Sequence, residues 1–275
     1  MENYLVNAYD IHLHTSPDVI ERKLDDEEMA KRASARGMRG FVIKNHYQDT
    51  SQRAAAVNKK YTNLNTAGGI TLNLSVGGIC AESVENAAKN GAKFVWFPTM
   101  DALSYNIHKK KNTENKISIL KNGVLIPEAY DVLDVIKQYK MILCTGHISV
   151  EESLALIHAG RIRSITKMIL THADSPSVFT DCEQQLKFVK EGALIEHSSF
   201  TLEVNATSWN LMMEQILRIG SRHIVLSSDL GQVSNPYPDD SLNEFVNGLL
   251  ERGIYQNEID QMIRTNPEWL LSDTY

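Results

Sequence analysis

The chain has 275 residues and a formal net charge of −6, and 43% of its residues are hydrophobic. A chain of this length buries about three quarters of its unfolded surface, so it needs no disulfide to fold. Its composition is that of an ordinary globular protein and excludes an intrinsically disordered one. The mild acidity argues against nucleic acid as the main partner, because phosphate binding requires a basic surface. The single basic run, Lys109–Lys111, is expected to be part of a solvated loop.

Neither a membrane nor a secretory pathway is indicated. The N-terminal residues lack the basic and apolar regions of a signal peptide, and no window approaches the roughly 18 apolar residues of a transmembrane helix. The cysteines Cys80, Cys144 and Cys182 are odd in number and scattered, which favours reduced thiols. We therefore expect a cytoplasmic protein without a membrane partner. The sequence leaves its oligomeric state open, a homo-oligomer included.

Segments of strand length alternate with segments of helical character along the chain. Strands are expected at Ala8–His14, Gly40–Asn45, Gly69–Val76, Lys93–Pro98, Met141–Thr145, Lys167–Thr171, Ala193–Glu196 and His223–Ser227. Helices are expected at Asp25–Arg36, Ser51–Tyr61, Glu82–Asn90, Glu128–Tyr139, Val150–His158, Cys182–Lys190 and Trp209–Ile219. Several of these helices are expected to stop at a glycine, namely at Gly37, Gly91, Gly160, Gly192 and Gly220.

Eight strands with helices between them predict parallel βα units that close into a (β/α)8 TIM barrel. A doubly wound open sheet is the alternative, but it would require a glycine-rich loop after the first strand, where this chain has His12-Leu13-His14. The polar stretch Ser104–Gly123 interrupts the pattern, and Lys121-Asn122-Gly123 is expected to form a tight turn. We expect a single barrel domain over residues 1–275, with a small hairpin after the fourth strand.

The first strand ends in a group of polar residues that suits a metal ion. Because side chains alternate along a strand, Asp10, His12 and His14 are expected on one face, opposite Ile11 and Leu13. Two imidazoles at the end of a strand can bind one metal ion from the same side. They can equally be ordinary polar residues at a strand terminus, and the pair alone does not decide between these readings.

Three later strands also end in polar side chains. His147, His172 and Asp229 follow the runs Met141–Gly146, Met168–Thr171 and Ile224–Ser228, and the C-terminal ends of barrel strands are where active sites of this fold lie. Nitrogen and oxygen ligands of this kind suit zinc, with manganese, iron or nickel as alternatives. The sequence therefore predicts a site for one or two divalent ions, most simply zinc.

The ordered set of His12–His14, His147, His172 and Asp229 resembles the amidohydrolase superfamily of metal-dependent hydrolases. The segment Asn266–Leu271 is similar to a closing helix motif frequent in that superfamily. The resemblance spans nearly the whole chain in order. It implies a (β/α)8 barrel that binds one or two divalent ions, in which Asp229 accepts a proton from the attacking water.

The fourth strand departs from that superfamily. Members with two metals usually bridge them with a carboxylated lysine or a glutamate on this strand, and Phe94–Pro98 contains neither. Lys44 ends the second strand and shares a face with His46; a lysine inside a barrel is costly unless paired, deprotonated or modified. Lys44 is therefore a candidate metal-bridging carboxylated lysine, a clamp for an anionic substrate, or an ion-pair partner of Glu196 or Asp10.

The segment Ile43–His46 also resembles the second strand of the polymerase-and-histidinol-phosphatase (PHP) phosphoesterases, which would make His46 a metal ligand. Those enzymes usually have a glutamate on the third strand and a histidine two residues after the late aspartate. This chain has Ile70–Leu74 and Gly231 at those places. A complete three-metal phosphoesterase site is therefore not expected.

Three residues are candidate substrate contacts: His46, Glu196 at the end of the seventh strand, and Arg22 just after the first. A rim salt bridge for Glu196 and a solvated pair of Arg22 with Asp18 are the alternatives. The predicted function is metal-dependent hydrolysis of a small amide, lactone or ester. Three alternatives stay open: a PHP-like phosphoesterase, a decarboxylase of a small acid and a catalytically silent metal-binding barrel. The net negative charge of the chain disfavours a deoxyribonuclease.

Overall fold

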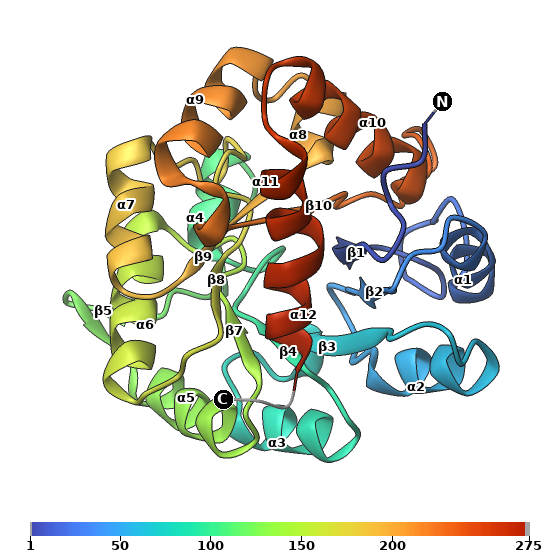
Figure 1. Ribbon diagram of the computed structural model, residues 1–275. Coiled ribbons are helices and arrows are strands. Elements are labelled where there is room, and N and C mark those ends of the chain that lie inside the picture. The colour runs from blue at the N-terminus through green and yellow to red at the C-terminus, as the bar shows by residue number, and fades with distance from the viewer. Residues whose placement is uncertain (1, 273–275) are drawn as a thin grey trace.

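The structure, a computed structural model, describes residues 2–272. Eight parallel strands are hydrogen-bonded in chain order and curve into a barrel (Figure 1), which confirms the predicted (β/α)8 fold. The barrel strands are β1 (Tyr9–Leu13), β2 (Gly40–Ile43), β3 (Ala67–Thr71), β4 (Phe94–Trp96), β7 (Ile142–Cys144), β8 (Met168–Leu170), β9 (Leu194–Ser198) and β10 (Ile224–Ser227).

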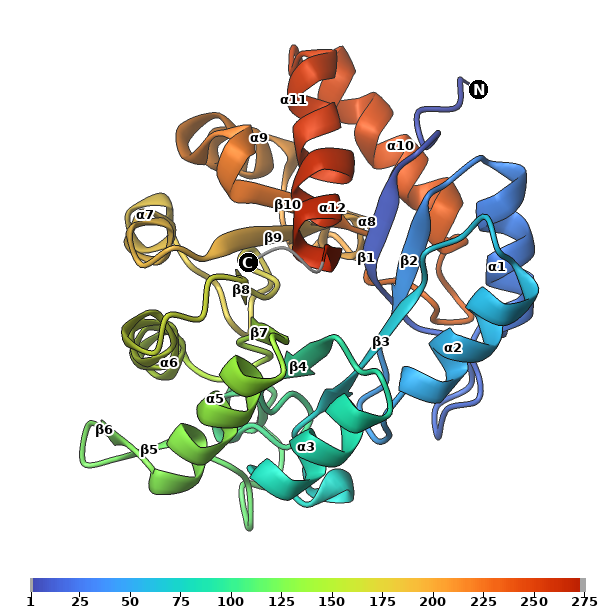
Figure 2. The same ribbon diagram turned by 60° about the horizontal axis from the view of Figure 1, so that its bottom comes forward.

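Helices surround the strands on the outside of the barrel (Figure 2). The α-helices are α1 (Asp26–Ala35), α2 (Ser51–Lys60), α3 (Ala81–Lys89), α4 (Leu103–His108), α5 (Pro127–Gln138), α6 (Val150–Ile162), α7 (Cys182–Lys190), α8 (Ser199–Glu203), α9 (Trp209–Ile219), α10 (Pro238–Glu251), α11 (Gln256–Asp260) and α12 (Asn266–Leu271). Short helical turns η1 (Leu74–Val76), η2 (Ser221–His223) and η3 (Gln261–Thr265) complete the set. Within residues 2–272, none of these helices has both the length and the apolar composition of a membrane span.

The alternation of side chains along the strands divides the hydrophobic core in two. One cluster fills the barrel and consists of Tyr9, Ile11, Val42, Ala67, Phe94, Trp96, Ile142, Cys144, Ile169, Leu194, Val225, Leu270 and Leu271. The alternate strand residues, such as Ile43, Val95 and Leu143, belong to the larger cluster that packs against the helices. Burying one such apolar side chain contributes about 1.5–3 kcal/mol, so both layers hold the strand ends in fixed positions.

The C-terminal helix α12 covers the end of the barrel where the strands begin (Figure 1). Its residues Leu270 and Leu271 complete the interior cluster. The Tyr9 hydroxyl, at the start of β1, donates to Glu268 Oε2 at 2.6 Å, and the Asn266 amide donates to the Ile224 carbonyl at 2.6 Å. The predicted closing segment is therefore a helix, and it leaves only the opposite end of the barrel open for a site.

The excursion after β4 contains the expected hairpin. Strands β5 (Leu120–Lys121) and β6 (Val124–Leu125) pair antiparallel. Asn122 and Gly123 join them with positive φ angles of 53° and 75°, a combination that fits a tight hairpin turn. The same excursion also contains α4, which the polar composition of this stretch did not indicate.

The third strand is shorter than predicted. We expected a strand over Gly69–Val76, but β3 ends at Thr71 and Leu74–Val76 is a turn of 3₁₀ helix. The Asn73 side chain explains the difference, because its amide donates to the His46 carbonyl at 2.8 Å and its oxygen accepts from the Thr99 amide at 2.9 Å. These bonds draw the chain out of the strand and tie the ends of neighbouring strands together.

One predicted helix end is wrong. We expected the sixth helix to stop at Gly160, but α6 continues through it to Ile162. A Cβ at Gly160 would lie 2.9 Å from Met168 Sδ and 3.0 Å from Leu143 Cδ2. The glycine therefore lies where the helix packs closely on the sheet and does not end the helix.

The loop between β7 and α6 provides a stability test with a matched control. Gly146 and Gly123 have similar positive φ angles of 67° and 75°, and alanine in this conformation costs about 1–2 kcal/mol. A Cβ at Gly146 would also lie 2.1 Å from the Phe97 carbonyl oxygen, whereas at Gly123 it meets nothing within 4 Å. Gly146→Ala is therefore expected to lower the free energy of unfolding by at least about 3 kcal/mol. The loss caused by Gly123→Ala should be clearly smaller. Urea unfolding measures both, and equal losses would contradict the packing argument.

Candidate metal centre

The first and last strands of the barrel meet at a seam beside the candidate site. The Asp229 amide donates to the His12 carbonyl at 2.8 Å, and the His14 amide donates to the Leu230 carbonyl at 2.7 Å. Gly231 follows with a φ of 140°, and a Cβ there would lie 1.9 Å from the His14 carbonyl oxygen. The chain after β10 can approach β1 this closely only because Gly231 has no side chain.

The structure corrects the expected face of Asp10. The register between β1 and β2 shifts between Asp10 and Leu13, so strict alternation does not hold and Ile11 belongs to the barrel interior. Asp10 Oδ1 accepts from the Ser228 amide at 3.0 Å and from the His12 amide at 3.2 Å. Its carboxyl group is fully buried, and burial raises its pKa to about 7. Asp10 therefore joins the strands at the seam and does not point toward the candidate site.

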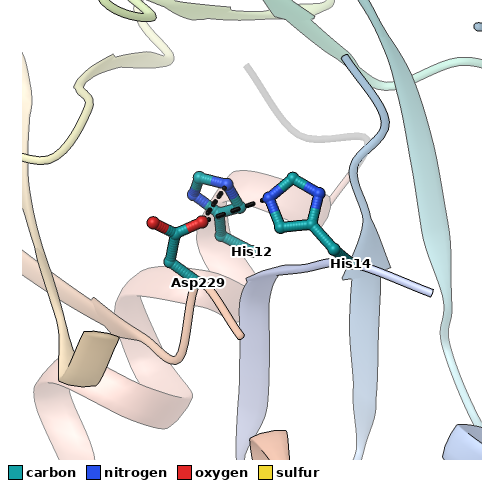
Figure 3. Close-up of side chains that lie close together, drawn as sticks. All are labelled: His12, His14 and Asp229. Atoms are coloured by element: carbon teal, nitrogen blue, oxygen red, sulfur yellow. Dashed lines mark hydrogen bonds and ion pairs between the residues drawn. The ribbon is translucent and has the colours of Figure 1, made fainter. Parts of the chain in front are cut away.

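His12, His14 and Asp229 converge at the open end of the barrel, as Figure 3 shows. Both His12 Nε2 and His14 Nε2 lie 3.1 Å from the same oxygen, Asp229 Oδ1. One ligand atom from each residue lies within 4.8 Å of the other two. Asp229 has a φ of 53°, in the left-handed region that Asp and Asn tolerate better than most residues other than glycine.

A buried carboxylate orients the His12 ring. His12 Nδ1 lies 2.7 Å from Glu196 Oε1, which also accepts a hydrogen bond from the Ser227 hydroxyl at 2.6 Å. A proton on Nδ1 leaves the lone pair on Nε2, which faces Asp229 Oδ1 at 3.1 Å beside His14 Nε2. A histidine whose far nitrogen is fixed by a carboxylate is the usual arrangement at a metal centre.

His172 adds a second candidate group that shares His12. His12, His172 and Glu196 can also present three ligand atoms within 4.8 Å of one another. His172 Nδ1 lies 3.6 Å from Asp229 Oδ2 and has no hydrogen-bond partner. Like Asp229, His172 has a positive φ, of 54°. Two overlapping ligand groups are compatible with either one ion or two.

His147 and His46 stand beside these groups. The His147 ring lies 5.1 Å from the His172 ring between centroids, and the His46 ring lies 4.9 Å from the His14 ring. His147 Nδ1 is buried without a hydrogen-bond partner, whereas His46 Nδ1 lies 2.8 Å from the Thr99 hydroxyl. Both histidines line a cavity of about 200 Å³, together with His14, His172 and Asp229.

The electrostatics of the site favour neutral imidazoles around an ionised carboxylate. Burial lowers the pKa of His14 to about 3 and that of His172 to about 4, and it also holds the pKa values of His46 and His147 well below the usual range. Although burial opposes it, the nearby His172 and His12 hold the pKa of Asp229 well below its usual range. Neutral histidines and an ionised carboxylate are the forms that bind metal.

His12 behaves differently from the other histidines. Burial and Lys44 oppose its protonation, but Glu196 and Asp229 outweigh both and raise its pKa. The position between the two carboxylates is therefore one that favours positive charge. A divalent ion ligated by His12 Nε2 would supply that charge, so these residues fit a metal ion.

Lys44 is completely buried and close to the candidate ligands. Its Nζ has no hydrogen-bond partner, and it lies 5.4 Å from the centroid of the Trp96 ring. Burial lowers the pKa of this amine, although Asp229 and Glu196 oppose the change. In the part of the chain that the structure describes, Lys44 has no ion-pair partner within 4.0 Å, so neither Glu196 nor Asp10 pairs with it directly.

Arg22 and Glu196 lie behind the ligands and are not among the residues that line the cavity. The Arg22 guanidinium forms a buried ion pair with Asp18 at 2.7 Å and lies 3.4 Å from His14 Nδ1. Glu196 lies next to His12, as described above. Of the three expected substrate contacts, the structure therefore brings only His46 to the cavity wall.

Sequence reasoning did not place several residues in the cavity wall. They come from the segments that follow the strands and are Met100, Tyr105, Lys109, Ser175, Ser177, Phe200 and Gln232. Thr99 and Asn73 were also missed, although they hold the backbone and ring of His46. Only Lys109 belonged to a motif that the sequence had singled out, the basic run Lys109–Lys111.

A comparison with protein families places the chain in one of them. Residues 7–196, about two thirds of the chain, match a family of unknown function, DUF6282. The chain belongs to this family. No curated protein matches the sequence.

Solved structures share the fold of this DUF6282 member at low sequence identity. A probable dipeptidase PvdM from Pseudomonas aeruginosa superposes with a TM-score of 0.70 and 9% identity, covering 97% of this chain and 94% of its own. A phosphotriesterase homology protein from Escherichia coli superposes with a TM-score of 0.65 and 15% identity, and the match covers 99% of this chain and 100% of that protein. A probable 2-pyrone-4,6-dicarboxylic acid hydrolase from Acinetobacter baumannii superposes with a TM-score of 0.62 and 11% identity, and the match covers 97% of this chain and 99% of that protein. The chain therefore has the barrel fold of amidohydrolase- and phosphotriesterase-like proteins, as the resemblance in its sequence implied.

The orientation of His12 by Glu196 leads to a prediction about metal affinity. Glu196→Gln removes the charged acceptor of His12 Nδ1 but keeps the size of the side chain, so it is expected to weaken divalent metal binding by about 10–100-fold. Competition with a chromogenic chelator measures the affinity. Glu191→Gln, on the surface beside Arg161, is the control and should leave the affinity unchanged. Equal affinities of the two variants would show that Glu196 does not act on the metal site.

Proposed function

We propose that this protein is a metal-dependent hydrolase that uses an activated water on a small ester, lactone or amide. The observation that supports this most directly is the placement of His12 Nε2 and His14 Nε2 at 3.1 Å from one carboxylate oxygen of Asp229. Three such donors at the open end of a barrel suit a divalent ion. Zinc is the ion we propose, and the reducing cytoplasm is the proposed compartment because the cysteines are free.

The residues that would hold the ion are His12, His14, His172 and Asp229, with His147 beside them. When bound, a divalent ion supplies a Lewis acid and a nucleophile at neutral pH. The protein keeps the His14 and His172 imidazoles buried and neutral, fixes the His12 ring through Glu196, and fixes the His14 ring through Asp229. Preorganised ligands of this kind need no rearrangement when substrate arrives.

Asp229 is the proposed general base. Oδ1 faces His12 and His14, while Oδ2 lies 3.6 Å from His172 Nδ1. Because Asp229 also lines the cavity, its carboxylate can accept a proton from the attacking water and return it to the leaving group. His46, whose ring is held by Thr99, lines the same wall and is proposed to contact the substrate.

Lys44 is the proposed residue for a second ion. A buried, unpaired amine with a lowered pKa is the form that reacts with carbon dioxide, giving a carbamate and a released proton. The carbamate oxygens would then add to the ligands at the floor of the site. The interior position of β4, where a bridging residue would otherwise stand, is filled by Trp96, whose ring lies 5.9 Å from the His12 ring.

A phosphoesterase is the second candidate function. His46 lies against His14 with ring centroids 4.9 Å apart, which is the observation that favours it. A panel of small carboxylate esters, lactones, dipeptides and phosphate monoesters, tested on zinc- and manganese-loaded protein, separates the two. Turnover of phosphate monoesters alone would replace the proposal by the second candidate, and no turnover on any member would contradict both.

The role of Asp229 can be separated from metal binding. Asp229→Asn keeps an oxygen ligand and a residue that tolerates a positive φ, but it removes the proton acceptor. It is expected to retain most of the bound metal and to lose turnover by at least about 10²-fold. Metal content and kcat on the best substrate of the panel are measured together. Asp134→Asn, an exposed site, is the control, and turnover unchanged in Asp229→Asn would exclude Asp229 as the base.

A further inference from the structure

The cavity has a cation at its mouth that the proposed chemistry does not use. Lys109 directly follows α4 and lines the cavity together with the histidines and Asp229. Its ammonium lies 6.0 Å from the centroid of the Tyr105 ring, and that ring lies 5.1 Å from the His147 ring. Only the Tyr105 ring therefore lies between the ammonium and His147. A small molecule is long enough to reach from the ammonium to the candidate metal ligands.

The charge of Lys109 is not compensated by the protein. Within residues 2–272 it has no acidic partner within 4.0 Å, and among the cavity residues the only other ionised side chain is Asp229, at the floor. Two other cations are paired, Lys116 with Asp101 at 2.5 Å and Arg22 with Asp18 at 2.7 Å. The Lys111 ammonium lies 5.6 Å from the centroid of the Tyr105 ring, but Lys111 is not among the residues that line the cavity. On a chain with a net charge of −6, a free cation at the mouth of a cavity attracts anions to that point.

The rest of the wall indicates the size and kind of molecule. A volume of about 200 Å³ is below the range of pockets for drug-sized ligands. Met100, Phe200 and the Tyr105 ring offer apolar surface for a short carbon chain, and the hydroxyls of Ser175 and Ser177 offer hydrogen bonds. The lining contains no arginine, the residue favoured for bidentate recognition of phosphate, and a single lysine matches the charge of one carboxylate.

We propose that the substrate is a small acid that has, besides its scissile ester, lactone or amide bond, a second carboxylate bound by Lys109. Lys109 is then a residue that determines specificity, and the basic run at the end of α4 is part of the binding site. This inference rests on the proposed function for its scissile bond, but the recognition of the second carboxylate is testable by binding alone.

The test compares two probes on zinc-loaded protein by isothermal titration calorimetry. Glutarate has two carboxylates and pentanoate has one on a chain of the same length, so any contact of one carboxylate with the metal centre is common to both. We expect glutarate to bind about 10–100-fold more tightly than pentanoate, as a charge-assisted hydrogen bond implies. The difference should shrink as ionic strength rises.

Two variants show whether Lys109 causes the difference. Lys109→Gln should bring the two affinities to within a few-fold of each other, whereas Lys110→Gln, the exposed neighbour outside the cavity, should preserve the wild-type ratio. Equal affinities of the two probes for the wild type, or a ratio that survives in Lys109→Gln, would overturn the inference.

Hydrolysis separates this inference from the proposed function. On the same protein, monomethyl glutarate should be hydrolysed with a lower KM than methyl pentanoate, and Lys109→Gln should raise KM for the former with little change in kcat. Hydrolysis of esters without this preference would contradict the inference alone. Glutarate binding that depends on Lys109, without turnover on any substrate of the panel, would contradict the proposed function alone.

Discussion

The seam between β1 and β10 is the constraint on which the candidate site depends. The first and last strands are far apart in the sequence, and they become neighbours only when the barrel closes. The hydrogen bond from the Asp229 amide to the His12 carbonyl places the carboxylate opposite two imidazoles. Gly231 permits this approach, because any side chain there would collide with the His14 carbonyl. The closure of the fold and the assembly of the site are therefore the same event.

Toward the open end of the barrel, the interior changes from apolar to polar side chains. Trp96, Cys144 and Val225 fill the interior below, and Glu196 and Lys44 lie above them without exposure to solvent. Burial keeps most of the histidines neutral, while the neighbouring imidazoles keep Asp229 ionised. The apolar layer thus both stabilises the barrel and sets the protonation states that a metal ion requires.

The sequence predicted the barrel and the strand-end residues because both depend on local patterns. A polar residue such as His147 or His172 within a few residues of the end of an apolar run marks the C-terminal end of a parallel strand. The register shift in β1 was not predictable in this way. It places Asp10 against the Ser228 amide, 218 residues away, and alternation within one strand contains no information about that partner.

For the residues in and around the cavity, too, local sequence patterns predict some positions, whereas others depend on tertiary contacts. Glu196 and Arg22 were predicted as substrate contacts, but Glu196 lies within β9 beside His12 and Arg22 lies beside His14. Which side of the histidines they occupy depends on packing with Ser227 and Asp18. Tyr105 lies on α4 and Lys109 directly follows that helix, in a polar stretch for which the sequence predicted only a solvated loop and a small hairpin. The path of such a loop over the barrel mouth is set by tertiary contacts, such as the Ser104 hydroxyl donating to the His147 carbonyl at 2.9 Å.

The presence of a divalent ion held by His12, His14 and Asp229 is the central claim, and metal content tests it most directly. Elemental mass spectrometry on freshly purified protein should find one or two divalent ions per chain, and the His12→Ala/His14→Ala double variant should lose them while keeping the circular dichroism of the barrel. A protein that binds no metal even after reconstitution with zinc or manganese, or a double variant that keeps the wild-type content, would contradict it.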